Sequence, residues 1–423
     1  MQWLALRWLA LLWLLWLACA LDANRKFFVS TSPGLEKILF QEVKGIIVAP
    51  ASVKLMKSNG VMVTVPREDY HTPMRMLLSL RTSLRVMELL DETEDEEINS
   101  KDDLYNRIYE YPWHSIIDHE STLKVDTILA GSRVSGDLSH SHFTSLTIKN
   151  AIADKFRSKY NNRPSVDVAC PDLFICCYLF NNKLTTYRVW NGVDSMHKRG
   201  YRTNTIHKAA LKEHVAAGLV LHSNWNATLA VEQGSALVDP LCGSGTILIE
   251  AALIDSNVAP GLLKYNSYED ISIKRWKDLD PAVFDAVYRD LQSRDKREVH
   301  SQDKDRRHLY QGNDIYRNAV DLAIESSQIC NVNIKYSCEN AKYYAPMSEI
   351  QCIITNPPWD LRLENAEASW EALNTFVLAN QRKINVHTLT ANPDVLKCLK
   401  LKPKSQLVLS PSNVESRYIQ FGE

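Results

Sequence analysis

Two glycines between apolar stretches form the first candidate site. The sequence reads Val238-Asp239-Pro240-Leu241-Cys242-Gly243-Ser244-Gly245-Thr246 and continues as apolar residues to Leu253. This order predicts a buried strand, a glycine turn and a helix that begins near Thr246. Gly243 and Gly245 permit a sharp bend and a close approach of the backbone to a ligand, and the free N–H groups of the helix start face the same point. The stretch predicts a nucleotide-like pocket, with an ordinary strand-to-helix turn as the alternative.

The glycine turn differs from two phosphate-binding patterns. No Gly-Lys-Ser/Thr follows it, so it is not a P-loop, and its glycines lack the Gly-x-Gly-x-x-Gly spacing.

A second stretch places an amide side chain before two prolines. Residues 353–359 read Ile-Ile-Thr-Asn-Pro-Pro-Trp. Because proline stiffens the backbone, Asn356 and the carbonyl of Pro357 are expected in fixed positions at the carboxyl end of a buried strand.

Together the two motifs resemble those of class I S-adenosylmethionine-dependent methyltransferases. In that family the first motif binds S-adenosylmethionine, and an Asn-Pro-Pro-aromatic motif marks methylation of an exocyclic amine on a base. The resemblance implies a catalytic set of Asn356, Pro357 and Trp359. It implies a cofactor-binding set of Asp239, Cys242, Gly243, Ser244, Gly245, Thr246, Asp314, Asn340 and Asn356.

Asp314 and Asn340 follow the stretches expected to form the next two strands of a Rossmann-like sheet, near 310–315 and 334–341. An acidic residue at the end of the second strand can accept hydrogen bonds from both ribose hydroxyls, although such a residue also often caps a turn. Asn340 stands where relatives usually carry an Asp for the adenine amine, and Tyr316 stands at a commonly acidic position.

The expected chemistry follows from the weakness of guanine N2 as a nucleophile, because its lone pair is delocalised into the ring. If the side-chain oxygen of Asn356 and the carbonyl of Pro357 each accept one N2–H, the amine becomes pyramidal and its lone pair localises. Trp359 would stack on the extruded base and offset about 1 to 3 kcal/mol of the unstacking cost. A core tryptophan after a proline turn is the alternative for Trp359.

The cysteines give no indication of a metal site or a disulfide framework. Apart from Cys19, they show no Cys-x-x-Cys spacing and mostly lie in apolar runs, as reduced core residues do. Cys242 could be a nucleophile, as in carbon-5 pyrimidine methylation. No Cys follows Pro357-Pro358 where such enzymes need it, so simple packing is favoured.

The first residues differ from the rest of the chain. The 423 residues are 45% hydrophobic and 23% charged, which is an ordinary globular composition. Residues 1–20 are rich in Leu, Trp and Ala with Arg7 as the single charge, and they are interpreted as a targeting segment, with a signal anchor as the alternative. No stable membrane insertion is expected after the leader is removed. Delivery to an organelle with its own ribosomes, a plastid or mitochondrion, is suggested, with the cytoplasm as the alternative.

Charge is unevenly distributed along a chain whose net charge is −1. Residues 149–212 contain twelve Lys and Arg against four Asp, whereas residues 91–97 are acidic and predict a solvated loop. A local basic stripe of this size can bind phosphates. The candidate RNA-binding residues are Lys149, Lys155, Arg163, Lys198, Arg199 and Arg202.

Periodicity predicts α/β modules on either side of the acidic loop. Strands are expected at 27–31, 61–65, 123–128, 173–180 and 184–190. Helices are expected at 35–43, where the helix is capped, at 74–90 and at 144–160. The charged residues 270–307 are expected to form a surface excursion with a helical centre at 281–291.

The basic half resembles a known RNA-binding module. The stretches 142–152, 163–167 and especially His197-Lys198-Arg199-Gly200-Tyr201-Arg202 are similar to the THUMP domain and exit linker of THUMP-containing RNA methyltransferases, in particular the bacterial large-subunit rRNA guanine-N2 methyltransferases. The expected domains are a targeting segment (1–20), a ferredoxin-like module (27–115), a THUMP domain (116–192), a basic linker (193–213) and a Rossmann-like class I methyltransferase domain (214–423). The family implies structured RNA, chiefly rRNA, as the partner.

The implied activity is S-adenosylmethionine-dependent methylation of guanine N2 in structured RNA, most simply large-subunit rRNA. The alternatives are a tRNA or small nuclear RNA guanine-N2 enzyme, adenine N6 methylation through the same four-residue motif, and a catalytically weak RNA-binding or ribosome assembly factor. Asn340, Tyr316 and the short C-terminus keep the last alternative open.

Overall fold

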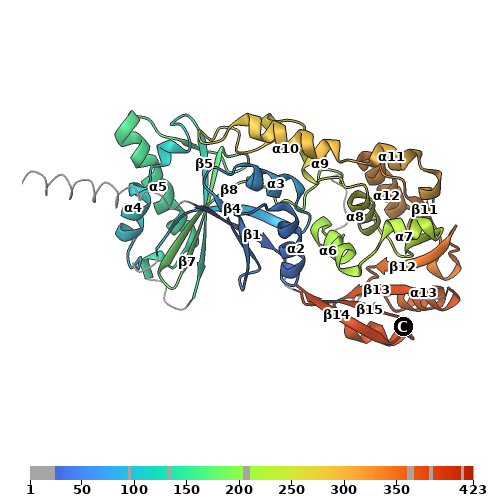
Figure 1. Cartoon of the computed structure of the whole chain (residues 1–423). Helices are drawn as coiled ribbons and strands as arrows, with labels where there is room; N and C mark the ends of the chain where they lie inside the picture. The colour runs from blue at the N-terminus through green and yellow to red at the C-terminus, as the bar shows by residue number, and fades with distance from the viewer. Residues whose placement is uncertain are drawn as a thin grey trace, which may run out of the picture.

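The structure is a computed structural model that describes residues 24–93, 97–131, 136–202, 210–359, 366–380, 384–410 and 414–422. Two mixed sheets organise these residues, one in each half of the chain (Figure 1). The predicted fold class, α/β modules followed by a Rossmann-like domain, is confirmed. The predicted targeting segment, residues 1–20, lies outside the described residues. Within the described part, no helix combines the length and apolar character needed to cross a bilayer.

The first sheet has eight strands in the order β2-β3-β1-β4-β8-β7-β5-β6. Its first four strands and two helices are β1 (Asn24–Thr31), α2 (Glu36–Ile46), β2 (Ser52–Met56), β3 (Gly60–Pro66), α3 (His71–Ser79) and β4 (Ser83–Glu92). All pairings among these four strands are antiparallel, and the βαββαβ order with β1 and β3 in the centre is that of a ferredoxin-like module.

The remaining strands extend this sheet. They and their helices are α4 (Lys101–Glu110), η1 (Trp113–Ser115), β5 (Thr122–Ala130), η2 (Gly136–Leu138), α5 (Ser141–Tyr160), β6 (Ser165–Val166), β7 (Leu173–Phe180) and β8 (Lys183–Val189). The strand β8 pairs with both β4 and β7, so the two modules share one sheet. Asn181 and Asn182, both at positive φ, form the two-residue turn between β7 and β8.

The second sheet has seven strands in the order β11-β10-β9-β12-β13-β15-β14. Its strands are β9 (Ser235–Asp239), β10 (Tyr310–Asn313), β11 (Lys335–Ser337), β12 (Glu349–Thr355), β13 (Asn385–Thr390), β14 (Pro403–Leu409) and β15 (Ser416–Phe421). The first five strands run parallel, and β15 is antiparallel to both β13 and β14. From β9 the chain adds β10 and β11 on one side of the sheet, and it then adds β12 and β13 on the other side of β9. The direction of strand addition therefore reverses between β9 and β12, which makes this the switch point of the sheet.

Helices cover both faces of the second sheet. They are α6 (Glu213–Ser223), α7 (Ala227–Glu232), α8 (Thr246–Asp255), α12 (Arg317–Cys330) and α13 (Ala366–Ala379), with the short turns η4 (Lys304–Arg306), η5 (Ala341–Tyr343) and η6 (Pro393–Cys398). Leu219, Leu248 and Ile354 belong to the core on one face, and Val238, Ile353 and Phe376 to the core on the other. The helix α8 is mostly apolar, and eight of its ten residues are buried, Thr246 and Glu250 among them.

Two expected elements are wrong. Residues 83–90 form part of β4 rather than a continuation of α3, because hydrogen bonds to β1 and β8 on both sides hold this stretch extended. The helix α2 does not carry the expected side-chain cap, since its N-cap residue is the apolar Leu35.

The charged segment 270–307 has the predicted helical centre, but it is not only a surface excursion. It contains η3 (Tyr268–Asp270), α10 (Pro281–Ser293) and α11 (Arg297–Gln302) and follows α9 (Gly261–Lys264). In Figure 1, α9 and α10 reach back along the top of the molecule to α3. Trp276 and Phe284 are buried in the core of the first sheet, and Asp278 accepts two hydrogen bonds from Arg188 at 2.9 and 2.7 Å. This segment therefore joins the two halves of the chain.

Candidate active site

The glycine turn between β9 and α8 has the predicted form. Gly243 and Gly245 have φ values of +52° and +74°, which only glycine adopts easily. A Cβ on Gly245 would lie 2.5 Å from the hydroxyl oxygen of Tyr336, whereas nothing lies within 4 Å of a Cβ built on Gly243. Packing therefore requires glycine at position 245, and open space lies beside the backbone at position 243.

Asp314 holds this loop in place. Its Oδ2 accepts a 2.9 Å hydrogen bond from the N–H of Gly243, and its Oδ1 accepts one from the N–H of Tyr316 at 3.0 Å. The N–H of Cys242 donates to the carbonyl of Asn313 at 2.8 Å. Each carboxylate oxygen has a second lone pair, so the predicted ribose contact remains compatible with these bonds. The sequence did not predict that Asp314 also fixes the turn.

Asp239 ends β9 under the loop and is 1% exposed. Its Oδ1 accepts a 3.2 Å hydrogen bond from the N–H of Leu241. Burial raises the pKa of Asp239 to about 7, because the carboxylate loses its hydration. Burial likewise raises the pKa of Cys242 well above its usual value, which keeps the thiol protonated and agrees with a packing role.

Asn340 lies between β11 and η5, and its predicted contact with adenine stays a prediction. Its Oδ1 accepts a 2.9 Å hydrogen bond from the N–H of Lys342, so it is the N-cap of η5. Beyond it Tyr343 is 70% exposed, and Tyr316 at the end of β10 is 55% exposed. Both tyrosines follow strands that end at the same edge of the sheet, and neither is among the predicted site residues.

The Asn-Pro-Pro-Trp motif directly follows β12, as predicted. Ile353 lies opposite Val238 in the parallel pairing of β12 with β9, so the glycine turn and this motif leave adjacent strands at the same carboxyl edge. This edge is the point where the strand order switches, which is where ligands bind in open α/β sheets.

Some buried polar atoms at this edge of the sheet lack a hydrogen-bond partner. Within the described residues, the Oδ1 of Asn356 and the hydroxyl of Thr388 are buried without a hydrogen-bond partner. Thr388 lies opposite Thr355 in the pairing of β13 with β12. Buried acceptors are usually satisfied, so an unpaired Oδ1 on Asn356 is suited to a substrate donor. Thr388 was missed because only the strand pairing brings it to the motif.

Trp370 of α13 holds the Asn-Pro-Pro-Trp motif through a hydrogen bond to its backbone. Its indole Nε1–H donates a 2.8 Å hydrogen bond to the carbonyl of Pro358. Pro357 is buried, while Pro358 and Trp359 are partly exposed. The partial exposure of Trp359 is compatible with its predicted stacking on a base.

The six predicted RNA-binding residues separate into two groups. Arg163 and Lys198 are exposed, Lys149 and Lys155 are partly exposed on α5, and Lys155 lies 4.7 Å from the ring centre of Tyr109. Arg199, by contrast, is 1% exposed, so its predicted phosphate contact is wrong. The guanidinium of Arg202 is directed into the protein, where it donates a 2.6 Å hydrogen bond to Oγ1 of Thr246.

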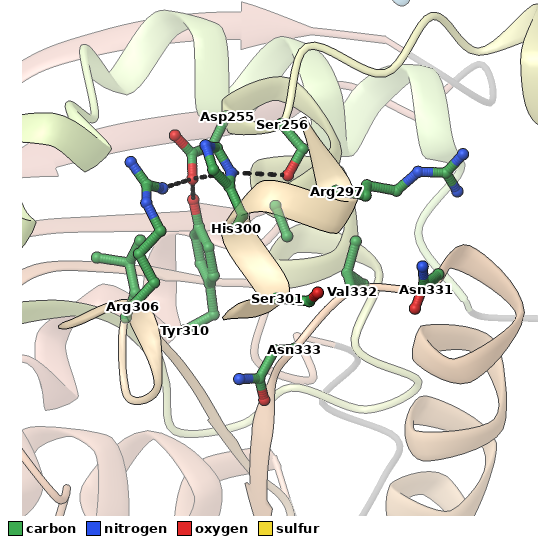
Figure 2. Close-up of a pocket in the computed structure, with 12 residues that line it drawn as sticks. Asp255, Ser256, Arg297, His300, Ser301, Arg306, Tyr310, Asn331, Val332 and Asn333 are labelled. Atoms are coloured by element: carbon green, nitrogen blue, oxygen red, sulfur yellow. Dashed lines mark hydrogen bonds and ion pairs between the residues drawn. The ribbon is translucent and has the colours of Figure 1, made fainter. Parts of the chain in front are cut away.

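Two cavities among the described residues lie away from this edge. Figure 2 shows one, of about 30 Å³, where His300, Arg306 and Tyr310 surround Asp255 at the end of α8. The hydroxyl of Tyr310 donates to Asp255 at 3.0 Å, and the volume suits one water molecule. The other, of about 410 Å³, lies beside Trp225 between α6 and α8. Both are at the amino ends of the strands and include none of the predicted site residues.

The described residues contain no group of three or more His, Cys, Asp or Glu side chains arranged to hold a metal ion. The cysteines among them are unpaired, and Cys176, Cys177, Cys242, Cys330 and Cys352 are buried.

The switch-point loop and the Asn-Pro-Pro-Trp motif on a mostly parallel sheet define a class I methyltransferase, whose methyl donor is S-adenosylmethionine. The sequence matches two domain families: residues 199–412 match the RMKL-like methyltransferase domain, and residues 99–187 match the THUMP domain. The chain belongs to the RMKL-like methyltransferase domain family. The THUMP match begins at residue 99, before the expected start at 116, and includes α4, which packs against α5. The other predicted boundaries stay predictions.

Similarity to individual proteins agrees with this assignment. The chain is 31% identical to a ribosomal RNA large subunit methyltransferase K/L of Pseudoalteromonas atlantica, over 94% of this chain and 53% of that protein. The chain spans about half the length of the curated relatives it matches.

Solved structures share the fold. A possible methylase from Clostridium difficile 630 is 24% identical with a TM-score of 0.77, over 95% of this chain and 98% of that one. A methyltransferase complexed with SAH is 20% identical, also with a TM-score of 0.77, over 95% and 99%.

Proposed function

We propose that this protein is an S-adenosylmethionine-dependent RNA methyltransferase that modifies the exocyclic N2 of a guanine in structured RNA, with large-subunit rRNA as the substrate. The observation that carries the proposal is the buried, unpaired Oδ1 of Asn356, which directly follows β12, the strand beside β9 and its glycine turn. An acceptor in this position fits an amine that donates hydrogen bonds from its N–H groups to the protein while its lone pair reacts.

The residues around the glycine turn fit S-adenosylmethionine. The backbone at Gly243 faces open space, the start of α8 provides free N–H groups, and the carboxylates of Asp239 and Asp314 lie beside the turn. A solved protein with the same fold was determined with SAH bound. When bound, S-adenosylmethionine supplies an electrophilic methyl group.

The chain's own contribution to the reaction is orientation of the amine. The Oδ1 of Asn356 accepts one N–H of the target amine, and the carbonyl of Pro357 accepts the other. These two bonds draw the nitrogen lone pair out of conjugation and fix its direction. The hydrogen bond from Trp370 to the carbonyl of Pro358 keeps the motif rigid, and Trp359 stacks on the extruded base.

RNA is held by the N-terminal half in this proposal. Lys149, Lys155, Arg163 and Lys198 supply positive charge, and the chain has a THUMP domain. The names of the relatives identify large-subunit rRNA as their substrate.

Methylation of separate RNA classes tests the substrate. The full chain is incubated with labelled methyl donor and with purified large-subunit rRNA, small-subunit rRNA, tRNA or small nuclear RNA, each free of prior modification. The proposal predicts incorporation into large-subunit rRNA. Preferential incorporation into tRNA or small nuclear RNA would favour the alternative guanine-N2 enzymes. RNA binding without incorporation into any class would favour an assembly factor.

Residues 1–20 carry a separate proposal about location. We propose that this apolar segment directs the protein to a plastid or mitochondrion, whose ribosomes contain the substrate. A fluorescent fusion to the full chain should localise to that organelle, and deletion of residues 2–20 should leave it in the cytoplasm. Cytoplasmic location of the intact fusion would contradict the proposal.

A further inference from the structure

The helix α8, which carries the glycine turn at its start, is held along one side by Arg81 of the N-terminal half and by residues 199–202, where the methyltransferase match begins. Thr246, Glu250 and Leu253 follow one another at intervals of four and three residues, so they lie on the same face of the helix. Arg202 contacts the first, Arg199 and Tyr201 contact the second, and Arg81 contacts the third.

The middle and end of this face are tied to the N-terminal half. Glu250 is fully buried, and its Oε1 lies 3.5 Å from Nε of Arg199 and accepts a 3.0 Å hydrogen bond from Tyr201. Arg199 also donates to the carbonyl of Arg81. Arg81 in turn donates to the carbonyls of Leu253 and Val258 at 3.5 and 2.7 Å. A cation beside the last carbonyls of a helix stabilises it, so helix stability accounts for Arg81.

The start of α8 is different, because there the cation opposes the helix dipole. Arg202 donates to Oγ1 of Thr246, the first residue of α8, and also to the carbonyl of Leu211. A cation at a helix start destabilises the helix, and Glu213 offsets the charge with Oε1 3.3 Å from Nε of Arg202. Helix stability therefore does not explain an arginine at this position.

Arg202 contacts the residue that directly follows the glycine turn. Thr246 follows Gly245 in the chain, and its Oγ1 lies 3.4 Å from the hydroxyl of Ser244. Thr246 is 4% exposed, so its side chain has little freedom to turn away from Arg202. The position of the turn thus depends on a residue of the linker that follows the THUMP domain.

From these contacts we infer that Arg202 is a positioning residue for the cofactor turn, acting through Thr246. The linker fixes the first residue of α8, so the turn keeps the shape that binds S-adenosylmethionine. Arg202 thereby serves the cofactor site and not the RNA. This inference rests on the proposed function, because it assumes that the turn binds the cofactor.

Affinity for S-adenosylhomocysteine, measured by calorimetry on the full chain without RNA, tests the inference. Arg202→Gln removes the charge, and we expect about a 10-fold loss of affinity, the scale of one hydrogen bond to a charged group. Arg202→Lys keeps the charge but cannot reproduce the fork of donors, so it should fold and still lose affinity. Equal affinity of both variants and the wild type would overturn the inference.

A double-mutant cycle separates positioning from general packing. Thr246→Val keeps the branched shape and removes the acceptor. If Arg202 acts through Thr246, the variant with both changes should bind no more weakly than the weaker single variant. Losses that multiply would show that the two residues act independently, and would overturn the inference.

Glu213→Gln is the matched control, because it weakens the ion pair of Arg202 with Glu213 without changing Thr246. Its melting temperature should fall, since a buried charge loses its partner, while affinity for S-adenosylhomocysteine stays within about twofold. A loss of affinity equal to that of Arg202→Gln would mean that Arg202 acts through the general stability of the linker. Failure of the wild type to bind S-adenosylhomocysteine would instead contradict the proposed function itself.

Discussion

The backbone N–H of Gly243 donates a 2.9 Å hydrogen bond to the carboxylate of Asp314. The two residues come from turns that follow neighbouring parallel strands, β9 and β10, and are 71 positions apart in the chain. The bond makes the shape of the cofactor turn depend on the adjacent strand. Binding of the cofactor should therefore be sensitive to Asp314 even apart from any direct contact.

Asp314→Ala should weaken binding of S-adenosylhomocysteine by about 10-fold or more, because the N–H groups of Gly243 and Tyr316 lose a charged acceptor. Calorimetric titration measures the change. Asp394→Ala is the control, since Asp394 is exposed and forms a surface pair with Lys397, and it should leave the affinity unchanged. Wild-type affinity in Asp314→Ala would contradict the organising role of this carboxylate.

Asp239 should make stability depend on pH. Burial raises its pKa to about 7, above the value of about 3.9 in an unfolded chain. The folded state therefore binds more protons between these values, and this group's contribution to stability decreases as pH rises from about 4 to 7.

Asp239→Asn removes that proton uptake and keeps an oxygen to accept the N–H of Leu241. Its melting temperature relative to the wild type should rise more at pH 8 than at pH 5, as measured by calorimetry at both values. An equal difference at the two pH values would show that the carboxyl group titrates normally.

Asn356→Ala should leave affinity for S-adenosylhomocysteine near that of the wild type and lower single-turnover methylation by roughly 100-fold, the scale for one lost oriented polar contact. The reason is that Asn356 follows the motif strand and its Oδ1 is unpaired within the described residues. A comparable loss of ligand affinity would move Asn356 into the cofactor site, and an unchanged rate would remove its role as amine acceptor.

Removing the charge of exposed basic residues should change RNA binding, whereas removing the charge of Arg199 should not. Replacing Lys149, Arg163 and Lys198 with Ala should weaken RNA binding and reduce the slope of log affinity against log salt by up to about 0.9 for each lost phosphate contact. Arg199→Ala should lower the melting temperature, because Glu250 loses a buried partner, and should leave the salt slope unchanged. A reduced slope in Arg199→Ala would mean that this residue reaches the RNA after all.

Local patterns were sufficient to predict the cofactor turn and the motif strand. Gly243 and Gly245 adopt the positive φ values that their place between two apolar runs suggested, and β12 ends directly before Asn356. Both features depend on neighbours in the chain, and short buried strands followed by Gly or Pro are strong local signals.

Most of the wrong predictions depend on distant partners, the missing side-chain cap of α2 being the local exception. Residues 83–90 are extended because β1 and β8 flank them, and Trp276 is buried because the segment around it crosses to the first sheet. Arg199 has the sequence context of an RNA-binding residue, yet Glu250 lies beside it in the fold. Sequence spacing does not indicate such pairs, so the role of Arg202 at Thr246 also emerged only from the structure.

The identity of the methylated nucleoside tests the central claim most directly. The full chain is incubated with unmodified large-subunit rRNA and methyl donor, and the RNA is digested to nucleosides and analysed by mass spectrometry. The account predicts N2-methylguanosine in the wild-type reaction and a loss of that product with Asn356→Ala. Formation of N6-methyladenosine, or no methylated nucleoside from a protein that binds S-adenosylhomocysteine, would contradict it.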